Sequence, residues 1–122
     1  MKLSAVRIFV RDVEEARRFY AEVLALPLKA DGSAQGYCIF GTDGTQLIVE
    51  AVTPDDPADD QALVGRFTGL SFATPDIHLK HRELVARGVP FSGAPERQFW
   101  GGWLATLNDP AGNGIQLVQL SA

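Results

Sequence analysis

The hydrophobic pattern of the chain occurs twice, once in each half. Residues 3–11 are rich in Val, Ile and Phe in loose alternation with polar residues, which predicts a strand, and Thr68–Thr74 repeats the pattern. Each strand leads to an aspartate, Asp12 or Asp76, of the kind that is typical of a helix N-cap. Apolar residues at helical spacing follow both aspartates, so each half is expected to continue as an amphipathic helix.

Three further strands are expected after each helix. The first helix should end at Pro27, which lacks a backbone donor, and the second at Gly88, a residue typical of helix C-terminal caps. Turns rich in Gly, Asn and Asp separate the segments that follow. The predicted strands are Leu28–Ala30, Tyr37–Phe40 and Thr45–Val52 in the first half, and Phe91–Ser92, Gln98–Leu107 and Gly114–Leu120 in the second.

The duplicated order of strand, helix and three strands predicts an α+β fold of two tandem βαβββ modules. The repeat covers residues 1–53 and 68–122, and the Pro- and Asp-rich residues 54–67 are interpreted as a flexible linker. Since each half is too short to bury much core, residues 1–122 are expected to fold as a single domain. Right-handed crossovers place both helices on one sheet face. The other face is free to curve, which predicts a curved mixed sheet around a cleft shared by the two halves.

Composition narrows the classes of function. The apolar content of 46% and charged content of 21% are those of a soluble globular protein, and the chain has no apolar run that could span a bilayer, so no membrane partner is expected. The net charge of -4 argues against nucleic acid, whose phosphates require a basic surface. The single cysteine, Cys38, cannot form an internal disulfide, which favours a cytoplasmic location. Its strand-like surroundings indicate a buried packing thiol rather than a nucleophile.

Two segments carry motifs beyond the repeat itself. Ala5–Leu28 combines a strand ending in Val-Arg-Asp with the pairs Phe19-Tyr20 and Val23-Leu24, and Asn108–Leu117 contains an Asp-Pro-x-Gly-Asn motif. Both segments resemble the vicinal oxygen chelate superfamily, which includes glyoxalase I, ring-cleaving dioxygenases and bleomycin-resistance proteins. The resemblance covers nearly the whole chain and implies a homodimer, with the halves either kept within one chain or exchanged between chains. It is specific for the fold rather than for a reaction, because this fold hosts many reactions.

The resemblance also implies where a metal ion would be bound. Metal enzymes of the superfamily take a His or Gln from the first strand of each half and a Glu from the last. The corresponding residues in this chain are Ala5, Glu50, Gly69 and Gln116. Ala5 and Gly69 have no donor atom, so only Glu50 would be a good ligand, with Gln116 a poor, neutral one. We therefore expect no metal cofactor and neither glyoxalase I nor extradiol dioxygenase activity; the alternative is a divalent metal at Glu50.

An arginine is expected near the position that the metal would occupy. Strand alternation places Ala5, Arg7 and Phe9 on one face of the first strand, and the resemblance implies that this face lines the cavity. Arginine is seldom buried without an anionic partner. We therefore predict that Arg7 pairs with Glu50 or with a bound anionic ligand. The alternative is a solvated Arg7 at the mouth of the cavity.

Both tryptophans lie in one aromatic segment, Phe99-Trp100-Gly101-Gly102-Trp103. Trp combines a large flat apolar surface with one donor, which suits stacking on planar or cationic ligands. In the drug-binding members of the superfamily, aromatic side chains on the corresponding strands stack on the ligand. We expect at least one Trp to line a ligand pocket. The alternative is that one Trp packs in the core and the other at a subunit interface.

Together these observations predict a metal-independent small-molecule binding protein, similar to bleomycin-resistance proteins, that sequesters an aromatic or amphipathic compound. An alternative is a glyoxalase- or dioxygenase-like enzyme, a lyase or isomerase, in which Glu50 is the general base of an atypical site. A scaffold that only dimerises is a third possibility. The predicted ligand-binding residues are Arg7, Phe9, Ile48, Glu50, Trp100, Trp103 and Gln116.

Overall fold

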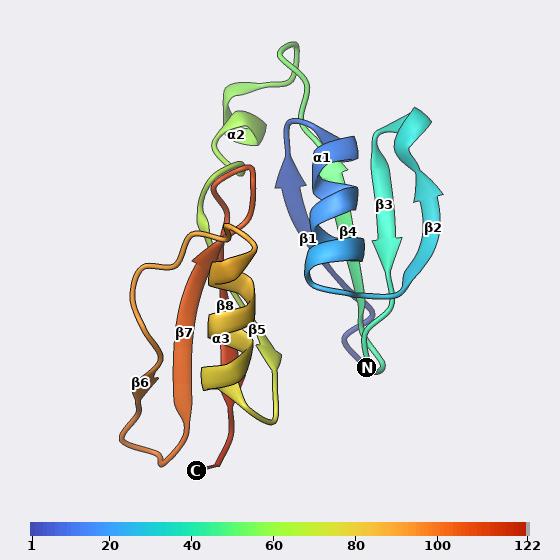
Figure 1. The fold of residues 1–122 in the computed structure, drawn as a ribbon. Helices are drawn as coiled ribbons and strands as arrows, with labels where there is room; N and C mark the ends of the chain where they lie inside the picture. Colours follow the sequence, from blue (N-terminus) through green and yellow to red (C-terminus); the bar gives the residue numbers. More distant parts are fainter. Residues whose placement is uncertain (122) are drawn as a thin grey trace. The chain divides into compact units, whose positions relative to one another are not determined.

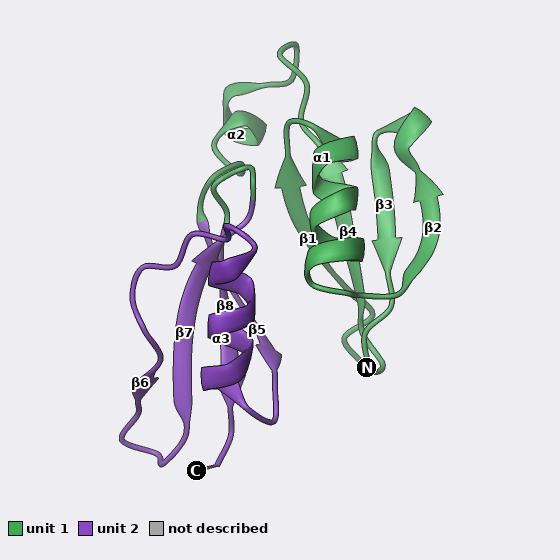
Figure 2. Ribbon diagram, viewed as in Figure 1, with its two compact units in different colours: residues 1–66, 110–113 green, residues 67–109, 114–122 purple. Residues whose placement is uncertain are grey.

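The structure, a computed structural model, describes residues 1–121, which form two compact units, shown in separate colours in Figure 2. Of the described residues, unit 1 comprises 1–66 and 110–113, and unit 2 comprises 67–109 and 114–121. Each unit contains a four-stranded mixed sheet, with a helix between its first two strands (Figure 1). The predicted α+β fold of two βαβββ modules is thereby confirmed.

Unit 1 follows the predicted order, with one additional helix in the expected linker. Its elements are β1 (Ala5–Val10), α1 (Val13–Arg18), the π-helix η1 (Phe19–Val23), β2 (Leu28–Gly32), the 3₁₀-helix η2 (Ser33–Gln35), β3 (Tyr37–Phe40), β4 (Gln46–Ala51) and α2 (Ala58–Gln61). The strand order is β1-β4-β3-β2, with β1 parallel to β4 and the other neighbours antiparallel. Prediction from sequence missed α2, because a Pro- and Asp-rich segment lacks the apolar periodicity that indicates a helix.

Unit 2 repeats this arrangement with a shorter edge strand. Its elements are β5 (Phe67–Ala73), α3 (Ile77–Ala86), β6 (Glu96–Arg97), β7 (Trp103–Asn108) and β8 (Gly114–Gln119), in the strand order β5-β8-β7-β6. The predicted strand Gln98–Leu107 is wrong at its start, because residues 98–102 form a turn closed by a hydrogen bond from the Gln98 amide to the Gly102 carbonyl (2.8 Å). In the predicted strand Phe91–Ser92, only Phe91 pairs, as an isolated bridge to β7.

The predicted helix caps are present. The Asp12 carboxylate accepts a hydrogen bond from the backbone amide of Glu15 at 3.1 Å, and Asp76 accepts one from Leu79 at 3.1 Å. These bonds satisfy amides that the first turn of a helix leaves without partners. At the end of α3, Gly88 adopts φ 84°, and the two hydrogen bonds of a Schellman motif close the helix.

The first helix was predicted to end at Pro27, but in the structure it ends earlier, with Leu24 as its C-cap. The amide of Leu24 donates to the carbonyl of Phe19 at 3.0 Å, which is the wider spacing of a π-helix. Ala25 then adopts φ 58°, a left-handed conformation that an α-helix cannot contain. Phe19 and Tyr20, at the start of the π-helix, are both buried and in edge contact, with ring centroids 5.1 Å apart.

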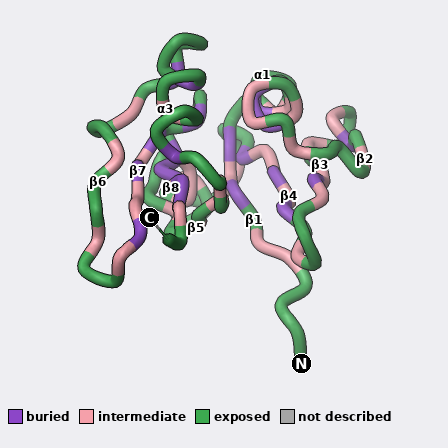
Figure 3. Tube along the Cα trace, turned by 60° about the horizontal axis from the view of Figure 1, so that its bottom comes forward, coloured by how far each residue is buried: buried purple, intermediate pink, exposed green. Residues whose placement is uncertain are grey.

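The core of each unit lies between its helix and one face of its sheet, and Figure 3 shows buried positions recurring along the strands. Cys38 on β3 belongs to the unit 1 core and is fully buried. Burial raises the pKa of the Cys38 thiol, so the nucleophilic thiolate is disfavoured. The interpretation of Cys38 as a packing thiol is confirmed. The core side chains of unit 1 are Ile8, Val10, Ala16, Phe19, Tyr20, Cys38, Phe40, Leu47, Val49 and Val52.

Candidate functional site

The sheet face of unit 1 that points away from α1 carries four of the predicted site residues. Arg7 and Phe9 alternate with the buried residues of β1. Parallel pairing places Ile48 beside Arg7 and Glu50 beside Phe9, so the four side chains share this face. A cavity of about 360 Å³ opens there. Its lining includes Arg7, Phe9 and Glu50 from the sheet, and Asp56, Asp60 and Leu63 from the segment around α2.

Arg7 and Glu50 form a bidentate ion pair. Nε of Arg7 donates to Oε1 of Glu50 at 2.8 Å, and Nη2 of Arg7 donates to Oε2 at 3.0 Å. Cζ of Arg7 lies 5.1 Å from the centroid of the Phe9 ring, so the guanidinium also makes a cation–π contact. The predicted pairing is confirmed. Hydrogen bonding to Glu50 raises the pKa of Arg7, which keeps the guanidinium a permanent cation.

This pair holds the Arg7 and Glu50 side chains in a flat, charged surface but contributes little to the free energy of folding. The Arg7 side chain is 55% exposed and that of Glu50 is 31% exposed, and exposed ion pairs contribute only about 0–1 kcal/mol. Because Phe9 covers part of Arg7 and about half of Arg7 remains exposed, a planar group can lie against the guanidinium. Each Glu50 oxygen accepts one hydrogen bond from Arg7, which occupies half of the acceptor positions of the carboxylate and fixes its orientation.

Tyr37 was not among the predicted site residues, but it extends the same face. Antiparallel pairing of β3 and β4 places Tyr37 opposite Glu50, and its side chain is exposed. The ring lies over Gly32, where any side chain would collide with it. The signal was present in the sequence, because Tyr37 precedes the buried Cys38 and must therefore point to the opposite face of the strand.

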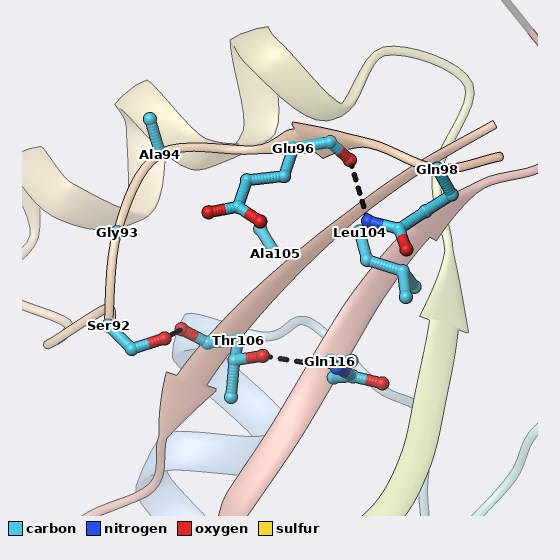
Figure 4. A pocket seen from close by; sticks show the side chains of 9 residues that line it. All are labelled: Ser92, Gly93, Ala94, Glu96, Gln98, Leu104, Ala105, Thr106 and Gln116. Atoms are coloured by element: carbon cyan, nitrogen blue, oxygen red, sulfur yellow. Dashed lines mark hydrogen bonds between the residues drawn. The ribbon is translucent and has the colours of Figure 1, made fainter.

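Gln116 lines a second cavity, of about 230 Å³, on unit 2 (Figure 4). Gln116 on β8 lies opposite Thr106 on β7, and its Nε2 donates to Oγ1 of Thr106 at 3.1 Å. Glu96 and Gln98 line the same cavity from β6 and the turn that follows it. Hydroxyl, amide and carboxylate groups therefore dominate this cavity, in contrast to the aromatic and ionic surface of unit 1.

Trp103 lies on the other face of the unit 2 sheet. It is paired with Gln119, whereas Gln116 is paired with Thr106, and side chains along β7 and β8 alternate between the two faces. The Trp103 ring contacts His78 of α3 edge-on, with centroids 4.6 Å apart. The structure therefore does not bring Trp103 and Gln116 together on one face.

Trp100 lies in the turn between β6 and β7 rather than on a strand. Its ring packs against Gly102, where an added side chain would collide with it, and 43% of Trp100 remains exposed. The preceding Phe99 is fully exposed. Neither tryptophan borders the cavity of Gln116, and contact of either one with a ligand stays a prediction.

The residues at the metal positions of the superfamily do not fit a metal ion. Ala5 and Gly69 offer no donor atom, and both Glu50 oxygens are bonded to Arg7. Gly69 has φ 75° at an irregularity in the pairing of β5, so a ligating side chain there would strain the backbone. In the part of the chain that the structure describes, no cluster of three or more His, Cys, Asp or Glu residues could hold a metal.

The sequence model of the Glyoxalase/Bleomycin resistance protein/Dioxygenase superfamily matches residues 2–117. Together with the two βαβββ modules, this match shows that the chain belongs to that superfamily. No curated protein gave a significant match. Among residues 1–121, no helix is long and apolar enough to cross a membrane.

Several solved structures resemble this chain over nearly its whole length. A superfamily member from Sphaerobacter thermophilus is 30% identical, with a TM-score of 0.79, and the match covers 98% of this chain and 97% of that one. TnmS3, described as an antibiotic binding protein from a Streptomyces species, is 28% identical, with a TM-score of 0.77 and coverage of 98% and 95%. A lactoylglutathione lyase from Agrobacterium tumefaciens is 17% identical with a TM-score of 0.77 and coverage of 97% and 92%, a likeness of fold alone.

Proposed function

We propose that this protein binds a small aromatic or amphipathic compound, without a metal ion, on the open sheet face of unit 1. The observation that carries the proposal is the bidentate Arg7–Glu50 pair lying against Phe9 beside a cavity of about 360 Å³. That volume falls within the usual range for small-molecule sites. The 28% identity to an antibiotic binding protein, TnmS3, supports a binding function of this kind.

Each residue of the proposed site has a distinct role. The guanidinium of Arg7 is planar and weakly hydrated, and it stacks well on aromatic groups. Glu50 uses both oxygens to hold the guanidinium in one orientation, so little side-chain entropy is lost when a ligand stacks on it. Ile48 and Leu63 add apolar contact, and Tyr37 supplies a second ring at the edge of the face.

Arg7 takes the electrostatic place that a metal ion has in the enzymes of the superfamily. A cation fixed beside Glu50 attracts electron-rich ring systems and carbonyl oxygens, but it has no open coordination position at which to activate them. The proposal therefore favours a binding protein over the alternative of a lyase or isomerase that uses Glu50. Contact of Trp100 and Trp103 with the ligand, a homodimeric state and a cytoplasmic location are further proposals, which rest on the residues and the superfamily resemblance.

The test is a titration of the ¹⁵N-labelled protein, followed by its backbone amide shifts, with 2-naphthol, 2-naphthoate and 2-naphthylmethylammonium. We expect saturable shifts centred on Phe9, Ile48 and Glu50 for at least one probe. The three probes share one ring system and differ in charge, so their relative affinities also report the sign of the potential at the site. Shifts confined to the Phe99–Trp100 turn, or no saturable shift with any probe, would contradict the proposal.

A further inference from the structure

We infer that the cavity of unit 1 selects ligands that carry an ammonium group beside an aromatic ring, and that Asp60 is the residue that makes this selection. The inference rests on the proposed function, because it names the ligand class of the same site. The proposed function leaves the charge of the ligand open, and the α2 segment of the cavity decides it. All the residues involved belong to unit 1.

The segment around α2, residues 53–64, supplies the wall of the cavity that does not come from the sheet. The Gln61 side chain fixes this segment, since its Nε2 donates to the Thr53 carbonyl at 2.6 Å and its Oε1 accepts from Nη1 of Arg11 at 2.5 Å. Val64 forms an isolated parallel bridge with Phe9. Figure 1 shows α2 near the carboxyl end of β1. Side chains on the segment therefore keep a defined place beside the Arg7 surface.

Negative charge exceeds positive charge in this cavity. Its lining contains the carboxylates of Glu50, Asp56 and Asp60, whereas Arg7 is the only Lys or Arg among the described residues that line it. Glu50 is paired with Arg7, and Oδ2 of Asp56 accepts a hydrogen bond from the Thr53 amide at 2.7 Å. The Asp60 carboxylate makes no hydrogen bond or ion pair with any described residue. Its charge is therefore available to a ligand.

The charge of Asp60 also reaches the surface on which an aromatic ring would stack. The hydrogen bond to Glu50 is the main cause of the raised pKa of Arg7, and the negative charge of Asp60 raises this pKa further. The two side chains thus interact through space while lining one cavity. A ring stacked on Arg7 can therefore direct an ammonium group on a short alkyl linker toward Asp60.

Charge disfavours the other ligand classes. An anionic ligand would be repelled by Asp60, and Glu50 already offsets the charge of Arg7. A neutral aromatic ligand would stack equally well but would gain nothing from Asp60. Arg11 does not neutralise Asp60 by contact, because it donates to the uncharged Gln61 amide and forms no ion pair among the described residues. The net charge of -4 favours a cation at longer range as well.

The test is a calorimetric titration with 2-naphthylmethylammonium and with its uncharged counterpart, 2-naphthylmethanol. Because Asp60 is exposed, we expect the ammonium probe to bind about three- to fivefold more tightly. Added sodium chloride should reduce this preference while leaving the affinity for the alcohol largely unchanged, since salt screens exposed charges.

Two failures are distinguishable in this titration. Equal affinity for the two probes, or a preference for the alcohol, would overturn the inference and leave the proposed function intact. Absence of saturable binding by either probe would contradict the proposed function itself, and the inference would fail with it.

Variants assign the preference to one carboxylate. Asp60→Asn keeps the side-chain shape and removes the charge, so both probes should bind this variant about equally. 2-Naphthylmethanol should bind it as it binds the wild type, which shows that the site is intact. Asp59→Asn is the matched control, because Asp59 is the exposed neighbour on α2 and does not line the cavity. A preference that survives in Asp60→Asn, or that Asp59→Asn loses equally, would overturn the inference.

Discussion

Replacing Asn113 with alanine should lower the free energy of unfolding by about 3 kcal/mol. Asn113 is fully buried in unit 1, where its Oδ1 accepts a hydrogen bond from the Gly65 amide at 2.9 Å and its Nδ2 donates to the Phe9 carbonyl at 2.8 Å. Alanine would leave both backbone groups without these partners, at about 1–3 kcal/mol for each group that remains buried. The side chain of this last residue of the Asp-Pro-x-Gly-Asn motif therefore holds the end of β1 in place.

Urea denaturation followed by circular dichroism measures this effect. Asn108→Ala is the matched control, because Asn108 immediately precedes the same motif but is exposed. The control should change the free energy of unfolding by no more than about 0.5 kcal/mol. Equal losses for the two variants would contradict a specific role for the Asn113 amide. Since Phe9 belongs to the proposed site, Asn113→Ala should also weaken the binding of aromatic ligands.

Replacing Arg7 with methionine should weaken binding of the best naphthalene probe about tenfold or more. A desolvated cation–π contact is worth about 2 kcal/mol, and methionine keeps much of the apolar length of the side chain while removing the planar cation. Glu50→Gln should have a smaller effect, because glutamine can still accept a hydrogen bond from Arg7 but loses the second charged contact.

Calorimetric titration of each variant measures these affinities. Arg82→Met is the matched control, because Arg82 is an exposed arginine on α3. Neither Arg7→Met nor Glu50→Gln should lower the free energy of unfolding by more than about 1 kcal/mol, since the pair is largely exposed. Unchanged affinity in Arg7→Met, or a loss that Arg82→Met shares, would contradict the role assigned to the guanidinium.

Local sequence signals were sufficient to predict the structure at positions where the residue type has one well-defined structural role. Asp12 and Asp76 are N-caps because a short carboxylate can accept a hydrogen bond from an amide of the first helical turn. Strand alternation placed Arg7 and Phe9 on one face, and the expected proximity of Glu50 then led to the ion pair. The ion-pair prediction required the period of a strand, the cost of an unpaired charge and the superfamily resemblance, which implied that this face of the first strand lines the cavity.

The strand prediction failed in the second half of the chain, where the start of β7 depends on a turn. The predicted strand Gln98–Leu107 would include Trp100 in the sheet. In the structure, residues 98–102 form a turn instead, so Trp100 lies outside the sheet and β7 begins at Trp103. The face that each β7 side chain occupies depends on the register between β7 and β8. No single motif in the sequence fixes that register. For the same reason, the bond between Gln116 and Thr106 could not be foreseen.

Calorimetry with the best naphthalene probe tests most directly whether Arg7, rather than a metal ion, provides the cationic surface. The protein is first dialysed against a chelator, and the titration is then repeated with added zinc, nickel or manganese. We expect the same affinity in every condition, and an affinity about tenfold or more weaker in Arg7→Met. Binding that appears only with a metal, and disappears in Glu50→Ala while Arg7→Met retains it, would contradict a metal-independent binding protein.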